Sequence, residues 1–112
     1  MIRIAICDDV SIICLAVKSD LESHNFGEKL KIDCFIDGMA LLQQAMKEKY
    51  DILIMDIQLV ESEQVGDVLN GMEISNRIKG IYPDITVIFM TGNAGYERQL
   101  LNFEPFRYIN KP

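Results

Sequence analysis

The sequence has few cysteines, and their spacing matches no common structural framework. Three of its 112 residues are cysteine, namely Cys7, Cys14 and Cys34, and no two of them are spaced as C-x-x-C. An odd number without that spacing indicates neither a disulfide framework nor a zinc site. We expect all three thiols to be reduced and largely buried, because free cysteine behaves as a small hydrophobic residue.

Long hydrophobic runs and positive charge are also scarce. The apolar stretch 2–7 meets Asp8 and Asp9 far below the length of a signal peptide or a membrane span, so we expect a cytoplasmic protein without a membrane partner. Lys and Arg number 11 against 17 Asp and Glu, which gives a formal charge of −6. That balance argues against direct contact between this chain and the phosphate backbone of a nucleic acid.

The sequence does contain an alternation of short apolar runs with helical patterns. It shows no repeat and no low-complexity segment, and its length suffices for one hydrophobic core but not for two. Runs rich in Ile, Val and Phe predict five strands, at residues 2–7, 31–36, 51–56, 85–91 and 106–110. Apolar residues at helical spacing predict helices around residues 13–21, 41–46 and 74–81, and a more polar helix at residues 94–103. Ser11 is placed to cap the first of these helices.

Strands that alternate with helices predict an open α/β sandwich, in which right-handed crossovers cover both faces of a parallel sheet. Residues 52–55, Ile-Leu-Ile-Met, are apolar throughout, as expected of a strand buried on both sides. In such folds the ligand site lies beyond the carboxyl ends of the strands, where the winding reverses. Function is therefore to be sought at those ends.

Polar residues follow or close four of the predicted strands. They are Asp8 and Asp9 after the first, Asp56 at the third, Thr91 at the fourth and Lys111 after the fifth. Taken singly, each has an ordinary explanation as a turn, cap, strand or solvated residue. Taken together they share one edge of the sheet, and three crowded carboxylates favour a hard cation, for which Mg²⁺ is the natural candidate. A carboxylate beside Mg²⁺ can attack phosphorus to form an aspartyl phosphate, with Lys111 and Thr91 contacting phosphoryl oxygens.

This set of residues resembles the receiver domain of two-component response regulators, over nearly the whole chain. The resemblance rests on Asp8-Asp9, Asp56, Thr91-Gly92 and Lys111-Pro112, which follow the family's order and approximate spacing. It implies an α/β fold with a doubly wound five-stranded parallel sheet of flavodoxin-like order 2-1-3-4-5. It also implies a phosphorylation-dependent switch, not an enzyme beyond limited phosphotransfer and autodephosphorylation of its own.

The resemblance assigns roles to individual residues of the acidic edge. Asp56 would accept a phosphoryl group from a sensor histidine kinase. Asp8, Asp9 and Asp56 would hold Mg²⁺ together with the backbone carbonyl of Gln58. The expected cofactor is therefore Mg²⁺, and the expected partner is a kinase.

The same resemblance makes Thr91 and Tyr108 the switch residues that report the phosphate. Tyr108 lies three residues before Lys111, although by residue type alone it is equally a strand aromatic packed on a helix. Cys7-Asp8-Asp9 and the stretch 96–112 look most like receivers attached to LytTR-type DNA-binding domains. We therefore expect residues 1–112 to be a receiver domain cut from a longer regulator, which contacts DNA only through an output domain.

The chain departs from the family pattern in three places. Residue 60, four after Asp56, is not the proline that receivers commonly have there. The Asn70-Gly71 turn comes fourteen residues after Asp56, about twice the usual connection, so residues 60–69 form an extra loop that is either a solvated excursion or a contact near the acceptor. The family's terminal helix is missing. We accordingly expect exposed apolar surface beside residues 106–109 and, through that face, a homodimer or low stability.

Two other functions fit the same architecture less well. A magnesium-dependent phosphatase with a strand-end aspartate needs a second acid two residues further on, and Gln58 stands there. A flavin-binding module is disfavoured because the acidic edge would repel the phosphate of FMN.

Overall fold

The computed structural model describes residues 1–24, 26–56, 71–91 and 107–110, with Thr91 and residues 107–110 described by their backbone alone. The strands are β1 (Ile2–Cys7), β2 (Leu30–Phe35), β3 (Ile52–Asp56), β4 (Thr86–Thr91) and β5 (Arg107–Asn110). The helices are α1 (Ser11–Ser23), α2 (Gly38–Lys47) and α3 (Gly71–Ile81). None of these three helices is long and apolar enough to cross a membrane.

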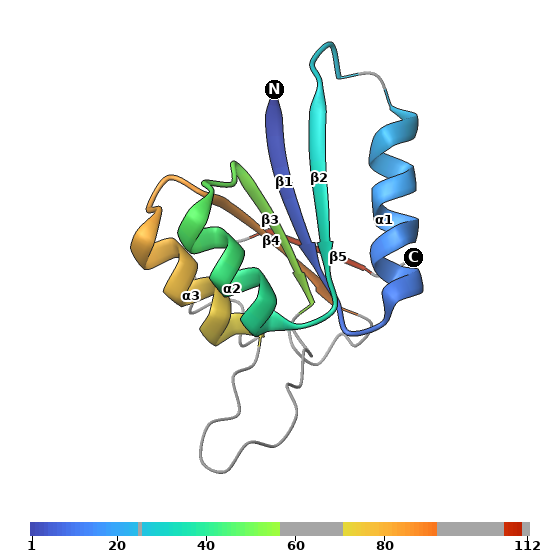
Figure 1. The fold of residues 1–112 in the computed structure, drawn as a ribbon. Helices are drawn as coiled ribbons and strands as arrows, with labels where there is room; N and C mark the ends of the chain where they lie inside the picture. The colour runs from blue at the N-terminus through green and yellow to red at the C-terminus, as the bar shows by residue number, and fades with distance from the viewer. Residues whose placement is uncertain (25, 57–70, 92–106, 111–112) are drawn as a thin grey trace.

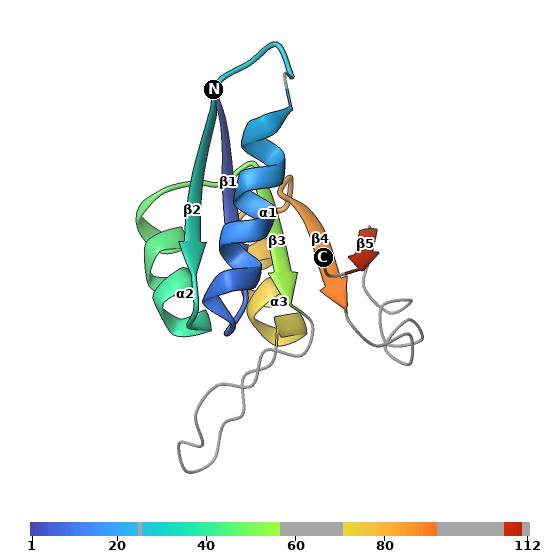
Figure 2. The same cartoon turned by 90° about the vertical axis from the view of Figure 1, so that its right-hand side faces the viewer.

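The five strands form one parallel sheet in the order β2-β1-β3-β4-β5. Figure 1 shows α1 on one face of the sheet and α2 with α3 on the other. Figure 2, turned so that α1 faces the viewer, shows the strands side by side behind that helix. The doubly wound, flavodoxin-like sheet expected from the sequence is confirmed. Because β2 and β3 flank β1 on opposite sides, the winding of the chain reverses between β1 and β3.

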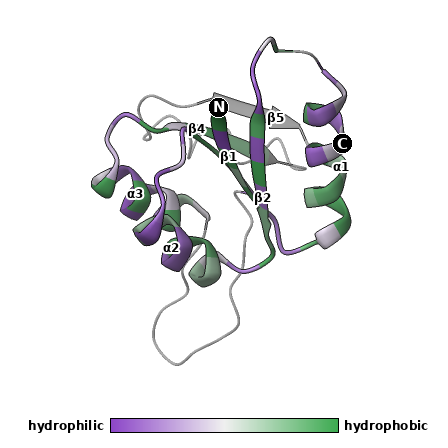
Figure 3. Cartoon of the chain, turned by 45° about the horizontal axis from the view of Figure 1, so that its top comes forward, coloured by the Kyte–Doolittle hydropathy of each residue, from purple (hydrophilic) through white to green (hydrophobic). Residues whose placement is uncertain are grey.

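Side chains of the central strands alternate between two hydrophobic cores, because successive residues of a strand point to opposite faces. Towards α2 and α3 the strands contribute Ala5, Cys7, Leu53, Met55, Val87 and Phe89. Towards α1 they contribute Ile4, Ile6, Ile54 and Met90. Both faces of these strands are therefore dry, which explains their continuous apolar runs. The edge strand β2 instead alternates hydrophobic and hydrophilic residues along its length, as Figure 3 shows.

The predicted strands agree with the structure to within one residue, but the prediction that Ser11 caps α1 is wrong. Ser11 is the first residue of the helix, and the cap position is Val10, which makes no side-chain capping bond. The carboxylate of Asp8 accepts the backbone N–H of Val10 at 2.9 Å, and the Val10 carbonyl accepts the N–H of Ile13 at 3.0 Å. The turn into the helix is thus made one residue earlier than predicted. The predicted helix at residues 94–103 lies outside the described residues.

The three cysteines are free, as predicted, and two of them are buried. Cys34 is half-buried at the edge of the sheet, whereas Cys7 and Cys14 are inside the two cores. Burial raises the pKa of the Cys14 thiol to about 11. Its sulfur lies 3.4 Å from the carbonyl oxygen of Phe35, so the protonated thiol donates a weak hydrogen bond that joins α1 to β2.

At the opposite end of the sheet from the aspartates, Tyr50 is buried in a polar setting. Its ring is 1% exposed, and its hydroxyl donates a hydrogen bond of 2.6 Å to the carboxylate of Asp33. The guanidinium of Arg3 lies 5.5 Å from the ring centroid, and the ring of Phe35 meets it edge-on at 6.3 Å. Burial, followed by the hydrogen bond to Asp33, raises the pKa of Tyr50 above its usual value.

Replacement of this phenol should change stability in a pH-dependent way. We expect Tyr50→Phe to lower the free energy of unfolding by about 1 kcal/mol near neutral pH, because a hydrogen bond to a carboxylate is lost. The folded state holds the phenolic proton more tightly than the unfolded chain. Its contribution is therefore complete below a pH of about 10 and is lost as the pH rises through the pKa of the folded state.

Urea unfolding of both proteins at about pH 7 and about pH 11 measures this effect. The stability of wild type should fall more between the two conditions than that of Tyr50→Phe. An equal fall in both proteins would show that the pKa of Tyr50 is not raised by folding.

Candidate metal centre

β1 and β3 end side by side where the winding of the sheet reverses. Cys7 is aligned with Met55 across the two strands, so the residues that follow, Asp8 and Asp56, emerge next to each other. Asp9 comes next, in the segment that leads into α1. In open α/β sheets this crevice outside the carboxyl ends of the strands is where ligands bind. The structure therefore brings the three aspartates together at the edge that the sequence indicated.

The three carboxylates form a compact cluster of two buried residues and one exposed residue. One oxygen atom from each of Asp8, Asp9 and Asp56 can be chosen so that these atoms all lie within 4.8 Å of one another. Asp8 is fully buried and Asp56 is 1% exposed, whereas Asp9 is exposed. The backbone N–H of Asp8 donates to the carbonyl of Phe35 at 3.0 Å, which ties this residue to the end of β2. The cluster thus has a rigid buried wall, and Asp9 borders the solvent.

This donor set fits a hard divalent cation. Carboxylates at this separation repel one another unless positive charge lies between them, and Mg²⁺ prefers oxygen ligands. Mg²⁺ also keeps several water molecules and binds phosphate oxygens in such sites, and the exposed Asp9 lets solvent reach the cluster. Asp8, Asp9 and Asp56 are therefore residues that could hold Mg²⁺. When bound, the ion would supply the positive charge that an approaching anion needs.

The two predicted switch residues lie on the neighbouring strands. Asp56 is aligned with Met90 of β4, and the next residue, Thr91, closes that strand. Thr91 is in turn aligned with Asn110 of β5, the strand that also carries Tyr108. The backbone thus puts the end of β4 directly beside the acidic cluster.

Other predicted features are placed only in part. Gln58, Lys111 and the extra loop 60–69 lie outside the described residues, so their roles stay predictions. Gly71, which the sequence analysis assigned to an Asn-Gly turn, is instead the first residue of α3. The cap of α2 was not predicted: the carboxylate of Asp37 accepts a backbone N–H of the first turn at 2.9 Å. An Asp directly before an apolar helical pattern is the signal that could have found it.

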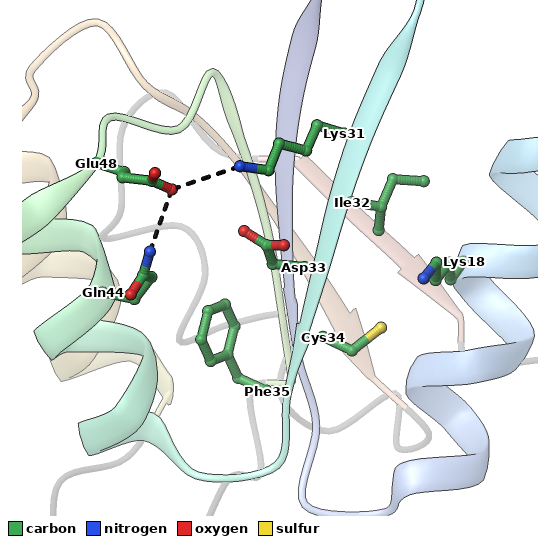
Figure 4. Close-up of a pocket in the computed structure, with 8 residues that line it drawn as sticks. All are labelled: Lys18, Lys31, Ile32, Asp33, Cys34, Phe35, Gln44 and Glu48. Carbon is green, nitrogen blue, oxygen red and sulfur yellow. Dashed lines mark hydrogen bonds and ion pairs between the residues drawn. The ribbon is translucent and has the colours of Figure 1, made fainter.

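A pocket of about 500 Å³ lies along the edge strand β2 and is lined by residues of β2, α1 and the end of α2 (Figure 4). Glu48 lines this pocket and makes several polar contacts. Its carboxylate accepts a hydrogen bond of 3.1 Å from Gln44, lies 3.8 Å from the ammonium of Lys31 and forms an ion pair with Arg3. The Gln44 hydrogen bond, followed by the charges of Arg3 and Lys31, lowers the pKa of Glu48. These opposite charges satisfy one another. We therefore assign the contacts to the packing of α2 against the sheet.

Comparison with known proteins identifies the class. The family description "Response regulator receiver domain" matches residues 4–112. Sensory transduction protein LytT of Bacillus anthracis is 30% identical over 113 residues, a match that covers 100% of this chain and 42% of LytT. Transcriptional regulatory protein RprY of Bacteroides fragilis is 23% identical, with 99% of this chain and 43% of RprY covered. The chain thus spans about two fifths of the length of these relatives.

Solved structures agree with this assignment. Response regulator protein TrrA of Thermotoga maritima, in complex with Mg²⁺-BeF, superposes with a TM-score of 0.77 at 27% identity, covering 100% of this chain and 88% of that one. A receiver domain protein of Methanospirillum hungatei gives a TM-score of 0.79 at 25% identity, covering 100% and 82%.

The chain belongs to the response regulator receiver domain family. Receiver domains are phosphorylatable signalling switches and not classical enzymes. They bind Mg²⁺ at an acidic pocket, are phosphorylated by histidine kinases and often dimerise. The acidic cluster of this chain is consistent with such a pocket.

Removal of the exposed carboxylate should weaken metal binding without loss of the fold. We expect Asp9→Asn to reduce the affinity for Mg²⁺ by at least about tenfold, because one negative charge beside the ion is lost. Its melting temperature should stay near that of wild type, since the side chain is exposed.

Titration calorimetry with MgCl₂ measures this affinity. Asp84→Asn is the control, because Asp84 is also exposed but lies in the turn before β4, at the other end of the sheet. Equal affinities of Asp9→Asn and wild type would remove Asp9 from the metal site.

Proposed function

We propose that this receiver domain accepts a phosphoryl group on Asp56 from a sensor histidine kinase. The observation that carries this proposal is the position of the Asp56 carboxylate. It is 1% exposed at the end of β3, and it belongs to a cluster whose oxygen atoms lie within 4.8 Å of one another. A carboxylate that is shielded from bulk water, yet lies beside the exposed Asp9, is suited to attack one bound reagent in preference to water.

The transfer exchanges one bond to phosphorus for another. An oxygen atom of Asp56 forms a bond to phosphorus while the P–N bond of the phosphohistidine breaks, and the electron pair of that bond stays on the imidazole nitrogen, which takes up a proton. Asp8, Asp9 and Asp56, with the backbone carbonyl of Gln58, would hold Mg²⁺. The ion supplies the charge that lets an anionic donor approach the carboxylates. Slow hydrolysis of the aspartyl phosphate would return the switch to its resting state.

The response to phosphorylation is proposed to run through the two neighbouring strands. Thr91 would donate its hydroxyl to a phosphoryl oxygen, Lys111 would pair with the phosphoryl charge, and Tyr108 would act as the switch aromatic. The strand register supports this assignment, because Thr91 follows the residue aligned with Asp56 and β5 carries Tyr108 beside β4. A phosphoryl group at Asp56 can shift an equilibrium only through such differential contacts.

The domain is proposed to control a DNA-binding output domain of the LytTR type beyond residue 112. Support comes from the similarity to LytT, of which this chain covers 42%. A homodimer of the phosphorylated form would bring two output domains together, and the formal charge of −6 leaves contact with DNA to those domains.

A phosphatase that uses the same aspartate is the second candidate, and it has less support. Its leaving group would need an acid two residues after Asp56, and that residue is Gln58, whose amide is not an acid.

Phosphoryl acceptance is tested by intact mass after incubation with acetyl phosphate and Mg²⁺. We expect a gain of one phosphoryl group in wild type and none in Asp56→Asn, because the amide is not a comparable nucleophile. EDTA should abolish the gain, since the carboxylates then repel the anionic donor. A gain that persists in Asp56→Asn or in EDTA would overturn the proposed site.

The role of Lys111 is tested separately from acceptance. Lys111→Ala should keep the fold and still accept some phosphate, but it should lose most of the conformational response, because the ion pair that distinguishes the phosphorylated state is gone. The measurement is the set of NMR shift changes at Thr91 and Tyr108 on phosphorylation, with Lys29→Ala as an exposed control. Shift changes equal to those of wild type would refute this role.

A further inference from the structure

We propose that Gly71 is a positioning residue for Asp56, because α3 begins so close to the end of β3 that no side chain fits between them. A Cβ atom on Gly71 would collide with the backbone carbonyl oxygen of Asp56 and would lie 3.0 Å from Cγ of Met55. A Cβ atom on Gly80, in the same helix, would meet nothing within 4 Å. The inference rests on the proposed function, since it concerns how the acceptor is held for phosphoryl transfer.

Neither the backbone of Asp56 nor the start of α3 can move away from this contact easily. On one side Asp56 is aligned with Met90 in the ladder between β3 and β4. On the other side α3 is anchored by Ile74 and Ile78, which are 0% and 1% exposed in the core between the sheet and the helices. Cβ atoms in folded proteins essentially never come within 3.0 Å of a heavy atom outside their own residue and its chain neighbours. A methyl group at Gly71 must therefore displace the helix or the backbone of the acceptor.

The contact is set by tertiary packing. Fourteen residues separate Asp56 from Gly71 in the sequence, yet the two backbones are in contact. The buried face of α3, and not a short covalent link, therefore brings its first residue against the acceptor. Displacement of a reacting group by about 1 Å can lower a rate on the order of a hundredfold. Glycine at this position thus controls where the Asp56 carboxylate lies relative to Asp8 and Asp9.

The test compares two glycine-to-alanine changes in one helix. For Gly71→Ala and Gly80→Ala, the initial rate of phosphoryl acceptance from acetyl phosphate is measured by intact mass, and the affinity for Mg²⁺ alone by calorimetry. We expect Gly71→Ala to react on the order of tenfold to a hundredfold more slowly and to bind Mg²⁺ more weakly, while Gly80→Ala matches wild type. Without metal, the amide NMR shifts of Met55 and Asp56 should move in Gly71→Ala only.

A stability control separates positioning from loss of the fold. Ile78→Ala removes a buried side chain two turns further along α3 and should lower the melting temperature. Trimethylamine N-oxide favours the folded state without relieving a local collision, and it is added until each variant has the helical circular dichroism of wild type. Ile78→Ala should then recover the wild-type rate, whereas Gly71→Ala should remain slow.

Full recovery of Gly71→Ala in the osmolyte, or a wild-type rate without it, would overturn the inference. If wild type itself accepts no phosphoryl group, the proposed function fails, and the Mg²⁺ affinities of the two alanine variants then decide the role of Gly71. Equal affinities would reject it, and weaker binding by Gly71→Ala would support it.

Discussion

The carboxylates of Asp8, Asp9 and Asp56 repel one another, and the sheet must hold them together against this repulsion. One oxygen atom from each lies within 4.8 Å of the other two, a separation at which like charges interact strongly in a protein environment. Flexible side chains on a loop would move apart. Here Asp8 directly follows β1 and Asp56 is the last residue of the adjacent strand β3, so the backbone register keeps the two residues side by side. The backbones of Asp8 and Asp56 can therefore separate only if the sheet opens.

The two hydrophobic cores supply the resistance to such opening. Burial of one large aliphatic side chain contributes roughly 1.5 to 3 kcal/mol, and each face of the central strands carries several such side chains. Because side chains alternate between the two cores, both faces of β1 and β3 are excluded from water. Polar residues are therefore found at the carboxyl ends of these strands. The apolar runs of β1 and β3 thus form the two cores, and the aspartates at the ends of these runs form the acidic cluster.

The sheet and the acidic cluster could be predicted from the sequence because both depend on local patterns. Each strand is a short apolar run, and Asp8 and Asp56 stand where such runs end. The features that were missed depend on contacts between distant residues or on exact backbone geometry. The cap position of α1 is taken by Val10 and not by Ser11. The backbone N–H of Val10 donates a hydrogen bond to the Asp8 carboxylate, a contact that the sequence pattern does not reveal. An Asn-Gly pair ordinarily signals a turn, but the packing of α3 draws Gly71 into the helix.

Among the residues that the structure describes, charged groups are arranged differently at the two ends of the sheet. At the amino ends of β1 and β2, ion pairs join Met1 to Glu28 and both Arg3 and Lys31 to Glu48. These groups satisfy one another within the chain. The carboxyl ends instead gather three acids within one small cluster. A cation or a covalently bound phosphoryl group there would interact most strongly with these three acids, because the Coulomb energy falls with distance. Under the proposed function, a ligand at the acidic end would shift an equilibrium between two conformations there, while Glu48, at the end of α2, stays paired with Arg3 of β1 and Lys31 of β2.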